Sequence, residues 1–246
     1  MVGFVSAEEF PLRLRGEILS LAFPLRVKAV TIDLDDTLLD TIPDLAAAAN
    51  MMLKELNRPT LDVTRIRTFV GNGVPKLVER ALAGAIDATA DPATFQRALP
   101  IYERCYAGLN GKHTTIYPGV LEGLDELRAQ GFPLACVTNK SERFTLPLLD
   151  HMKLSAYFSE VVAGDTLRKK KPDPLPLLHA CGKFGVAPRE MLMIGDSLSD
   201  AQAARAAGCP VFCVTYGYNE GRDVRELDID AIVASLIEAT RLIQKA

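Results

Sequence analysis

Long apolar segments and an excess of positive charge are both missing from this sequence of 246 residues. No apolar run approaches the roughly 20 residues that a membrane-spanning helix needs. Charged side chains interrupt the first 23 residues, which therefore lack the apolar core of a signal peptide. The formal net charge of -3 gives no sign of the basic surface that nucleic-acid binding requires. We expect a cytoplasmic protein whose partners include neither a membrane nor a nucleic acid.

The sequence also lacks the cysteine and histidine patterns of disulfide-rich and zinc-binding proteins. Its five cysteines are an odd number and include no Cys-x-x-Cys pair. The three histidines show no ligand spacing. Cysteines in apolar strand and helix patterns are typical of buried free thiols, and a reducing cytosol is their usual compartment.

Short apolar runs that alternate with helical patterns are what the sequence does contain. The runs begin near residue 30 and recur at 132–137, 158–163, 191–194 and 211–214. Such alternation predicts an α/β protein with a doubly wound, Rossmann-like parallel sheet. A final helix is expected over residues 230–243.

One long segment interrupts this alternation. Residues 42–112 contain helical patterns at 44–56, 61–69, 74–83 and 94–109 and no convincing strand. We interpret this segment as a small α-helical cap inserted into a catalytic core of residues 27–41 and 113–246. Residues 1–26 would form an N-terminal extension with one helix around 12–21.

Polar residues collect where the predicted strands end. In a doubly wound sheet, ligands lie beyond the carboxyl ends of the strands, so these residues are expected to meet. They are Asp33, Asp35, Thr138, Asn139, Asp196 and Asp200, together with Lys171 before a helix that Asp173 caps. Adjacent carboxylates repel each other and are costly to bury, which predicts a shared cation. Mg²⁺ is the simplest candidate because hard cations prefer oxygen ligands.

This set of residues suits phosphoryl transfer. A cation lets an anionic carboxylate approach an anionic phosphate ester. One carboxylate can then attack phosphorus, while a second protonates the leaving oxygen and later takes a proton from water. Lys171 and the Thr138 hydroxyl can hold the remaining phosphate oxygens.

The same residues resemble, in order, the four motifs of the haloacid-dehalogenase-like hydrolases. The motifs are Asp33-Leu34-Asp35-Asp36-Thr37, Thr138 after a strand, Lys171 before Pro-Asp-Pro, and the run from Gly195 to Asp200. The resemblance implies that Asp33 is the nucleophile and Asp35 the general acid and base. It also implies that Asp33, the backbone carbonyl of Asp35 and Asp196 bind Mg²⁺, with Ser197 and Asp200 in support.

Further segments are similar to those of the phosphoglycolate phosphatases, namely residues 70–73, 117–120, 137–140, 169–174 and 215–218. This similarity implies hydrolysis of 2-phosphoglycolate to glycolate and phosphate, with the loop Gly71-Asn72-Gly73 facing the active site. Asn72 and Asn139 would then bind substrate. Arg67 and Lys76 are further candidates to meet a substrate carboxylate, although solvated surface positions are the simpler interpretation.

One residue departs from that pattern. Asp36 stands where these phosphatases usually have glycine. Asp tolerates left-handed turn conformations better than most residues, so the turn can form. We expect the Asp36 side chain to point outward, away from the anionic substrate.

Other functions remain open at this stage. A phosphomutase or a phosphatase for another small ester would use the same chemistry, whereas a dehalogenase would not need the acid and base at Asp35. A phospho-receiver signalling domain also combines paired Asp residues, Mg²⁺, Thr and Lys on a parallel sheet, but it would hold a stable aspartyl-phosphate. Either a monomer or a homodimer is compatible with the sequence.

Overall fold

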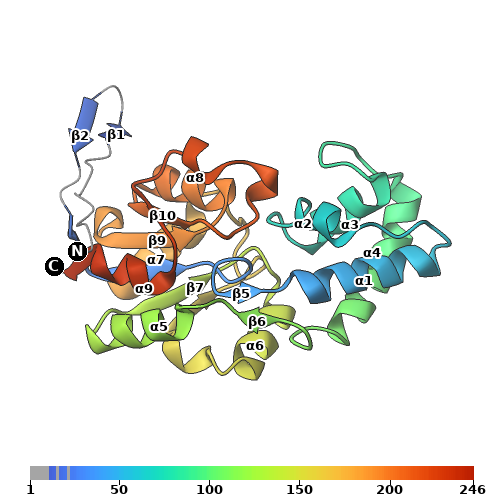
Figure 1. Cartoon of the computed structure of the whole chain (residues 1–246), viewed down its shortest axis with the longest axis horizontal. Coiled ribbons are helices and arrows are strands. Elements are labelled where there is room, and N and C mark those ends of the chain that lie inside the picture. The colour runs from blue at the N-terminus through green and yellow to red at the C-terminus, as the bar shows by residue number, and fades with distance from the viewer. Residues whose placement is uncertain (1–10, 15–16, 21–22) are drawn as a thin grey trace, which may run out of the picture.

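A six-stranded parallel sheet forms the centre of the protein. The computed structural model describes residues 11–14, 17–20 and 23–246 (Figure 1). The strand order across the sheet is β11-β10-β9-β4-β7-β8, and each neighbouring pair is parallel. The strands are Ala29–Ile32 (β4), Leu134–Val137 (β7), Glu160–Val162 (β8), Met191–Gly195 (β9), Val211–Val214 (β10) and Ala231–Val233 (β11).

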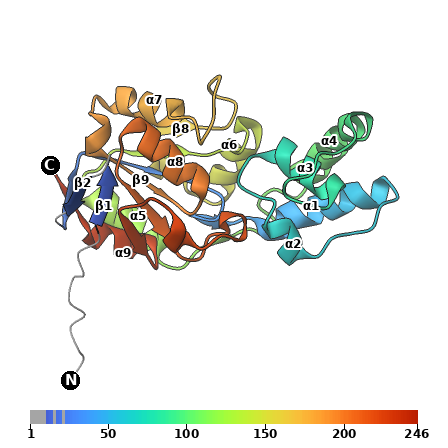
Figure 2. The ribbon, with the colours of Figure 1, turned by 90° about the horizontal axis from the view of Figure 1, so that it is seen from above.

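Helices cover both faces of this sheet (Figures 1 and 2). One face packs against α5 (Val120–Ala129), α6 (Glu142–His151) and α9 (Leu236–Arg241), and the other against α7 (Leu175–Phe184) and α8 (Leu198–Ala207). The four central strands are buried along their whole length, as expected for parallel strands between two helical layers. The predicted doubly wound α/β sheet is therefore confirmed. None of the described helices combines the length and apolar character needed to cross a bilayer.

A second group of helices lies beyond the carboxyl end of β4, as Figure 1 shows. It consists of Ile42–Glu55 (α1), Val63–Arg67 (α2), Val74–Ala83 (α3) and Pro92–Ala107 (α4). These helices bury their apolar residues mainly in a cluster of their own, separate from the two clusters on the sheet. The short antiparallel strands Leu39–Asp40 (β5) and Thr115–Ile116 (β6) flank the group where the chain enters and leaves it. Short 3-10 helices lie at Ser155–Tyr157, Pro188–Glu190, Asn219–Gly221 and Val224–Glu226.

Several expected helices are wrong or too long. The segment expected as one C-terminal helix begins with β11, continues with the six-residue α9 and ends in Ile243–Lys245 (β12), which pairs with Leu25–Val27 (β3). The apolar residues of β11 gain a hydrogen-bonded place beside β10 at the sheet edge, and this tertiary pairing overrides the helical spacing. The helix α2 is also shorter than the predicted 61–69.

The N-terminal helix expected around residues 12–21 is also wrong. Its described residues form two antiparallel strands, Pro11–Leu14 (β1) and Glu17–Ser20 (β2). Gly16, in the middle of the expected helix, disfavours helical structure. The remainder of the predicted extension before Phe23 lies outside the described residues.

The buried carboxylate of Asp44 connects the segment that enters the second group of helices to the segment that leaves it. Asp44, in the first turn of α1, is fully buried. Its carboxylate accepts hydrogen bonds from the backbone N–H groups of Gly111, His113 and Thr114 and from the Thr114 hydroxyl, at 2.8–3.2 Å. One side chain therefore accepts the hydrogen bonds of three backbone N–H groups in the segment that follows α4.

Replacing this carboxylate should destabilise the protein. We expect Asp44→Ala to lower the free energy of unfolding by about 2–4 kcal/mol, because it leaves several buried N–H groups without partners. Urea unfolding would measure the change. Asp87→Ala, at an exposed position in the same group of helices, is the control and should stay within about 0.5 kcal/mol of wild type. Equal effects of the two substitutions would contradict this role of Asp44.

Candidate active site

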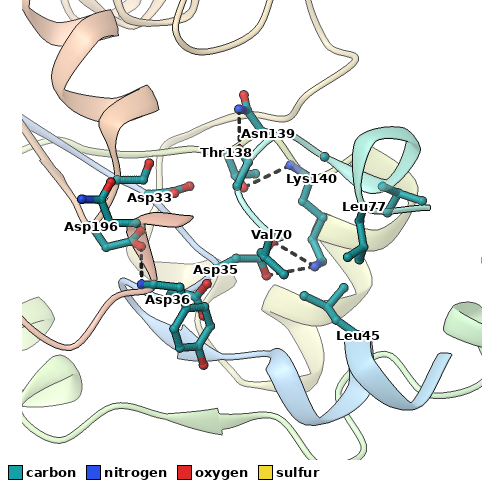
Figure 3. A pocket seen from close by; sticks show the side chains of 16 residues that line it. Asp33, Asp35, Asp36, Leu45, Val70, Leu77, Thr138, Asn139, Lys140 and Asp196 are labelled. Atoms are coloured by element: carbon teal, nitrogen blue, oxygen red, sulfur yellow. Dashed lines mark hydrogen bonds and ion pairs between the residues drawn. The ribbon is translucent and has the colours of Figure 1, made fainter. Parts of the chain in front are cut away.

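Acidic side chains from two neighbouring strands meet at the carboxyl end of the sheet. Asp33 follows β4 directly, and its backbone N–H donates to the carbonyl of Ile194 in β9. Asp196 follows β9, and Asp200 lies in the first turn of α8. One carboxylate oxygen from each of these three acids lies within 4.8 Å of the others. Figure 3 shows Asp33 and Asp196 beside one pocket.

A buried lysine connects two of these acids. Lys171 is 2% exposed, and its Nζ lies 2.8 Å from Asp33 Oδ1 and 2.7 Å from Asp200 Oδ1. It also donates to the carbonyl of Val137, at 2.6 Å. Although burial lowers the pKa of Lys171, the two carboxylates outweigh that effect and raise it above its ordinary value. The ammonium therefore stays charged and holds one oxygen of Asp33 in place.

Lys171 alone does not offset the negative charge of these buried acids. Burial raises the pKa of Asp33 to about 7, and Asp200 and Asp35 add to this effect against the attraction of Lys171. Burial, followed by repulsion from Asp200 and Asp33, raises the pKa of Asp196 well above its ordinary value. Carboxylates that are this costly to ionise fit a divalent cation, which prefers oxygen ligands and would offset their charge.

Asp200 is already engaged by groups of the protein. Its Oδ2 accepts hydrogen bonds from the Ser197 hydroxyl at 2.7 Å and the Ser197 backbone N–H at 3.1 Å. Its Oδ1 faces Lys171. The structure therefore places Asp200 and Ser197 where they orient Lys171 and the start of α8. Asp196 is engaged as well, since its two oxygens accept from the Thr37 hydroxyl and from the backbone N–H of Tyr218, both at 3.1 Å.

Asp35 points to a different set of partners. Its Oδ1 accepts from the Thr41 hydroxyl at 2.8 Å, and Lys140 Nζ lies 2.9 Å and 3.1 Å from its two oxygens. Lys140 is buried and comes two residues after Thr138. Sequence reasoning assigned Lys140 no role. Its position within the segment 137–140 was the available signal, but nothing in the sequence indicated that its side chain would reach Asp35.

The predicted phosphate- and substrate-binding residues separate into two groups. Thr138 and Asn139 line the pocket, as does Ser197. The Asn139 amide donates to the carbonyls of Gly71 and Lys171, both at 2.9 Å, and so joins the two neighbouring loops. Asn72 does not line this pocket, and its amide donates to Glu220 at 2.7 Å. Gly71 and Gly73 of the same loop do line the pocket, so the substrate contact of Asn72 stays a prediction.

Asp36 does not point outward, so that expectation is wrong. Its φ of 67° is left-handed, as the turn required, but only 3% of the residue is exposed and it lines the pocket. Its Oδ1 has no hydrogen-bond partner in the described part of the chain. Burial, followed by repulsion from Asp196 and Asp35, raises its pKa well above the ordinary 3.8. The tight turn after β4 therefore encloses the Asp36 carboxylate, a side chain that glycine at this position would not have.

The opposite wall of the pocket is apolar and comes from the second group of helices. Leu45 of α1, Val74 and Leu77 of α3, and Val70 from the loop before α3 all line it. Figure 3 places Leu45 and Leu77 on the side of Lys140 that is away from Asp33 and Asp196. A small anionic group could therefore bind at the polar end, with a short apolar segment facing these side chains.

Comparison with known proteins identifies relatives along most of the chain. The profile of haloacid dehalogenase-like hydrolases matches residues 30–214. A phosphoglycolate phosphatase of Nitrosospira multiformis is 62% identical over 91% of this chain and 99% of that protein. One of Thiobacillus denitrificans is 57% identical over 92% and 99%, respectively. The crystal structure of a predicted phosphoglycolate phosphatase from Haemophilus somnus superposes with a TM-score of 0.81, at 35% identity over 86% of this chain and 95% of that one.

The buried Asp36 should lower the stability of the metal-free protein. Because its pKa is raised in the folded state, the protein loses stability as pH rises above 3.8 and this carboxyl must ionise. We expect Asp36→Gly to raise the free energy of unfolding by about 1–3 kcal/mol at about pH 8, and by less at about pH 4. Asp36→Asn, which cannot ionise, should remove only the pH-dependent part. A gain that is the same at both pH values would refute this account of Asp36.

Proposed function

Because the chain belongs to the haloacid dehalogenase-like hydrolase family, we propose that this hydrolase converts 2-phosphoglycolate to glycolate and phosphate. The family membership confirms the first resemblance seen in the sequence. The observation that carries the proposed reaction is the meeting of Asp33 and Asp196 beside one pocket, with Lys171 Nζ 2.8 Å from Asp33 Oδ1. The substrate is proposed from the two bacterial phosphoglycolate phosphatases, which match this chain over nearly their whole length.

The proposed first step is attack of Asp33 on phosphorus. Lys171 and the backbone N–H of Leu34 both engage Asp33 Oδ1, at 2.8 Å. Among the described residues no hydrogen bond engages Oδ2, which is the oxygen we assign to the attack. The new bond joins Oδ2 to phosphorus as the bond from phosphorus to the leaving oxygen breaks, giving an aspartyl-phosphate.

Asp35 is the proposed general acid and base. It donates a proton to the leaving oxygen, so that this oxygen of glycolate departs as a neutral hydroxyl and not as an alkoxide. It then takes a proton from a water molecule that attacks phosphorus, which releases phosphate and regenerates the Asp33 carboxylate. Lys140 and Thr41 fix its orientation in both steps.

The remaining polar residues are proposed to hold the phosphoryl oxygens. The Thr138 hydroxyl lies at the carboxyl end of β7, beside the pocket. Lys171 supplies positive charge next to Asp33, with its Nζ 2.8 Å from Asp33 Oδ1. Asp33, Asp196 and the backbone carbonyl of Asp35 would hold Mg²⁺. When bound, Mg²⁺ would neutralise the repulsion between the phosphate ester and these carboxylates.

We also propose that residues 42–112 act as a cap over a core of residues 27–41 and 113–246. The apolar pocket wall contributed by α1 and α3 supports this division. A phosphomutase acting on another ester is disfavoured by the names of the relatives, and a phospho-receiver domain by membership of a hydrolase family. The cytoplasmic location and the monomeric or dimeric state stay predictions.

Catalytic efficiency across a panel of small phosphate esters tests the proposal. We expect 2-phosphoglycolate to have the highest kcat/KM, at least about tenfold above other small esters, a difference of roughly 1.4 kcal/mol in transition-state binding. Phosphate release would be the measurement.

Asp33→Asn keeps the shape of the nucleophile and should lower kcat at least about a thousandfold without loss of folding. A low rank for 2-phosphoglycolate would remove the substrate, whereas near-normal turnover by Asp33→Asn would remove the nucleophile.

Removal of divalent metal should abolish this activity. We expect EDTA followed by gel filtration to lower kcat/KM for 2-phosphoglycolate at least about a hundredfold, because the unscreened acids repel the substrate. Readdition of Mg²⁺ should restore the rate, while an equal ionic strength of NaCl should not. Undiminished phosphate release in the presence of chelator would show that the acids work without a divalent ion.

A further inference from the structure

The proposed substrate carries a second anionic group, a carboxylate, in addition to its phosphate. In 2-phosphoglycolate a carboxylate lies two bonds from the leaving oxygen. The pocket that receives it is lined by four aspartates, Asp33, Asp35, Asp36 and Asp196. A site selective for this ester therefore needs a cation near the leaving oxygen, separate from the groups that hold phosphate.

The candidates expected from the sequence are engaged elsewhere. The Arg67 guanidinium lies 3.7 Å from the centre of the Tyr218 ring and donates to the carbonyl of Tyr216. Lys76 pairs with Glu79 at 2.7 Å on the partly exposed side of α3. Neither of these cations, nor Asn72, is among the residues that line the pocket.

One cation does line the pocket. Of the 16 described residues around it, only Lys140 is positively charged (Figure 3). Its side chain is 2% exposed, and its Nζ lies 4.9 Å from the centre of the Tyr106 ring. The Lys140 carbonyl accepts hydrogen bonds from the Gly164 N–H at 2.7 Å and from the Thr145 hydroxyl at 3.2 Å. Both ends of this lysine are therefore held in place.

Lys140 retains a donor for a further anion. An ammonium group has three N–H donors, and the hydrogen bonds that the structure describes for this one both go to Asp35. Asp35 is also the residue proposed to protonate the leaving oxygen. The Lys140 ammonium is consequently next to the position from which the rest of the substrate extends.

We propose that Lys140 is a specificity-determining residue that binds the carboxylate of the substrate. The proposal rests on the proposed hydrolysis of 2-phosphoglycolate. The carboxylate carbon lies only about 2.4 Å from the leaving oxygen, since each intervening bond is about 1.5 Å long. An ammonium group within hydrogen-bond distance of Asp35 can therefore reach both groups. Leu45, Val70 and Leu77 face the same space and suit the single methylene between them.

A simpler role for Lys140 would be to position Asp35 alone. The two roles differ in what they do to substrate preference. A lysine that only positions the general acid affects every phosphate ester in proportion, whereas one that binds the carboxylate affects 2-phosphoglycolate more than an ester without that group.

The test compares 2-phosphoglycolate with ethyl phosphate, which has the same two carbons and no carboxylate. We expect Lys140→Met to lower kcat/KM for both esters and to lower their ratio, 2-phosphoglycolate over ethyl phosphate, at least about tenfold. Lys76→Met, which removes a partly exposed lysine of α3, should leave the ratio unchanged. A ratio in Lys140→Met equal to that of wild type would overturn the proposal.

Binding of the product supplies a readout that does not depend on turnover. We expect glycolate, measured by calorimetry in the presence of Mg²⁺, to bind Lys140→Met at least about tenfold more weakly than wild type, and equal affinities would overturn the proposal. If Lys140→Met does not fold, Lys140→Gln and Lys140→Arg take its place. Arg should retain the substrate ratio better than Gln, and the reverse order would contradict a charged contact.

The outcomes also separate this inference from the proposed function. Wild type that prefers 2-phosphoglycolate, with a ratio that survives in Lys140→Met, would overturn only the role of Lys140. Wild type that prefers ethyl phosphate would overturn both the substrate and the carboxylate contact. Wild type that hydrolyses neither ester would overturn the proposed reaction, and glycolate affinity would then decide the role of Lys140.

Discussion

Repulsion among buried carboxylates is the constraint on which the rest of the site depends. Asp33, Asp36 and Asp196 are all nearly or completely buried at one end of the sheet, and each has a raised pKa. Two buried lysines oppose this repulsion from different sides. Lys171 lies between Asp33 and Asp200, while Lys140 pairs with Asp35. This separation gives the two acids of the first motif different surroundings, as different chemical roles require.

The sheet brings these groups together because its central strands are neighbours in space but not in sequence. β4 lies between β7 and β9, so the residues that follow three distant segments meet at one edge. The loops must also approach one another closely. A Cβ at Gly217 would lie 2.0 Å from the Cβ of Asp196, so only glycine allows this loop to pack against the acid.

The sequence was sufficient to predict the residues that follow the strands, but not the contacts that their side chains make. Strand ends are visible as apolar runs that stop at polar residues, which is why Asp33, Thr138 and Asp196 were identified. The partners of Asp36 and Lys140 depend on turn geometry and on long side chains that cross the pocket, and neither has a sequence period. The same limit explains the C-terminal error, since the pairing of β11 with β10 is a tertiary interaction that outweighs local helical spacing.

The contacts between the second group of helices and the sheet add a further physical effect. The loop before α3 is joined to the core through Asn139, whose amide donates to Gly71, and through Lys170, which donates to the carbonyl of Asn72 at 2.7 Å. A partly buried ion pair at 2.7 Å connects Arg80 of α3 to Glu220 beyond β10. The apolar side chains of these helices line the same pocket as Asp33, Asp36 and Asp196, which are themselves nearly buried. In such surroundings each charge interacts more strongly than it would in water, so the arrangement that makes the carboxylates costly to bury also makes each cation beside them more effective.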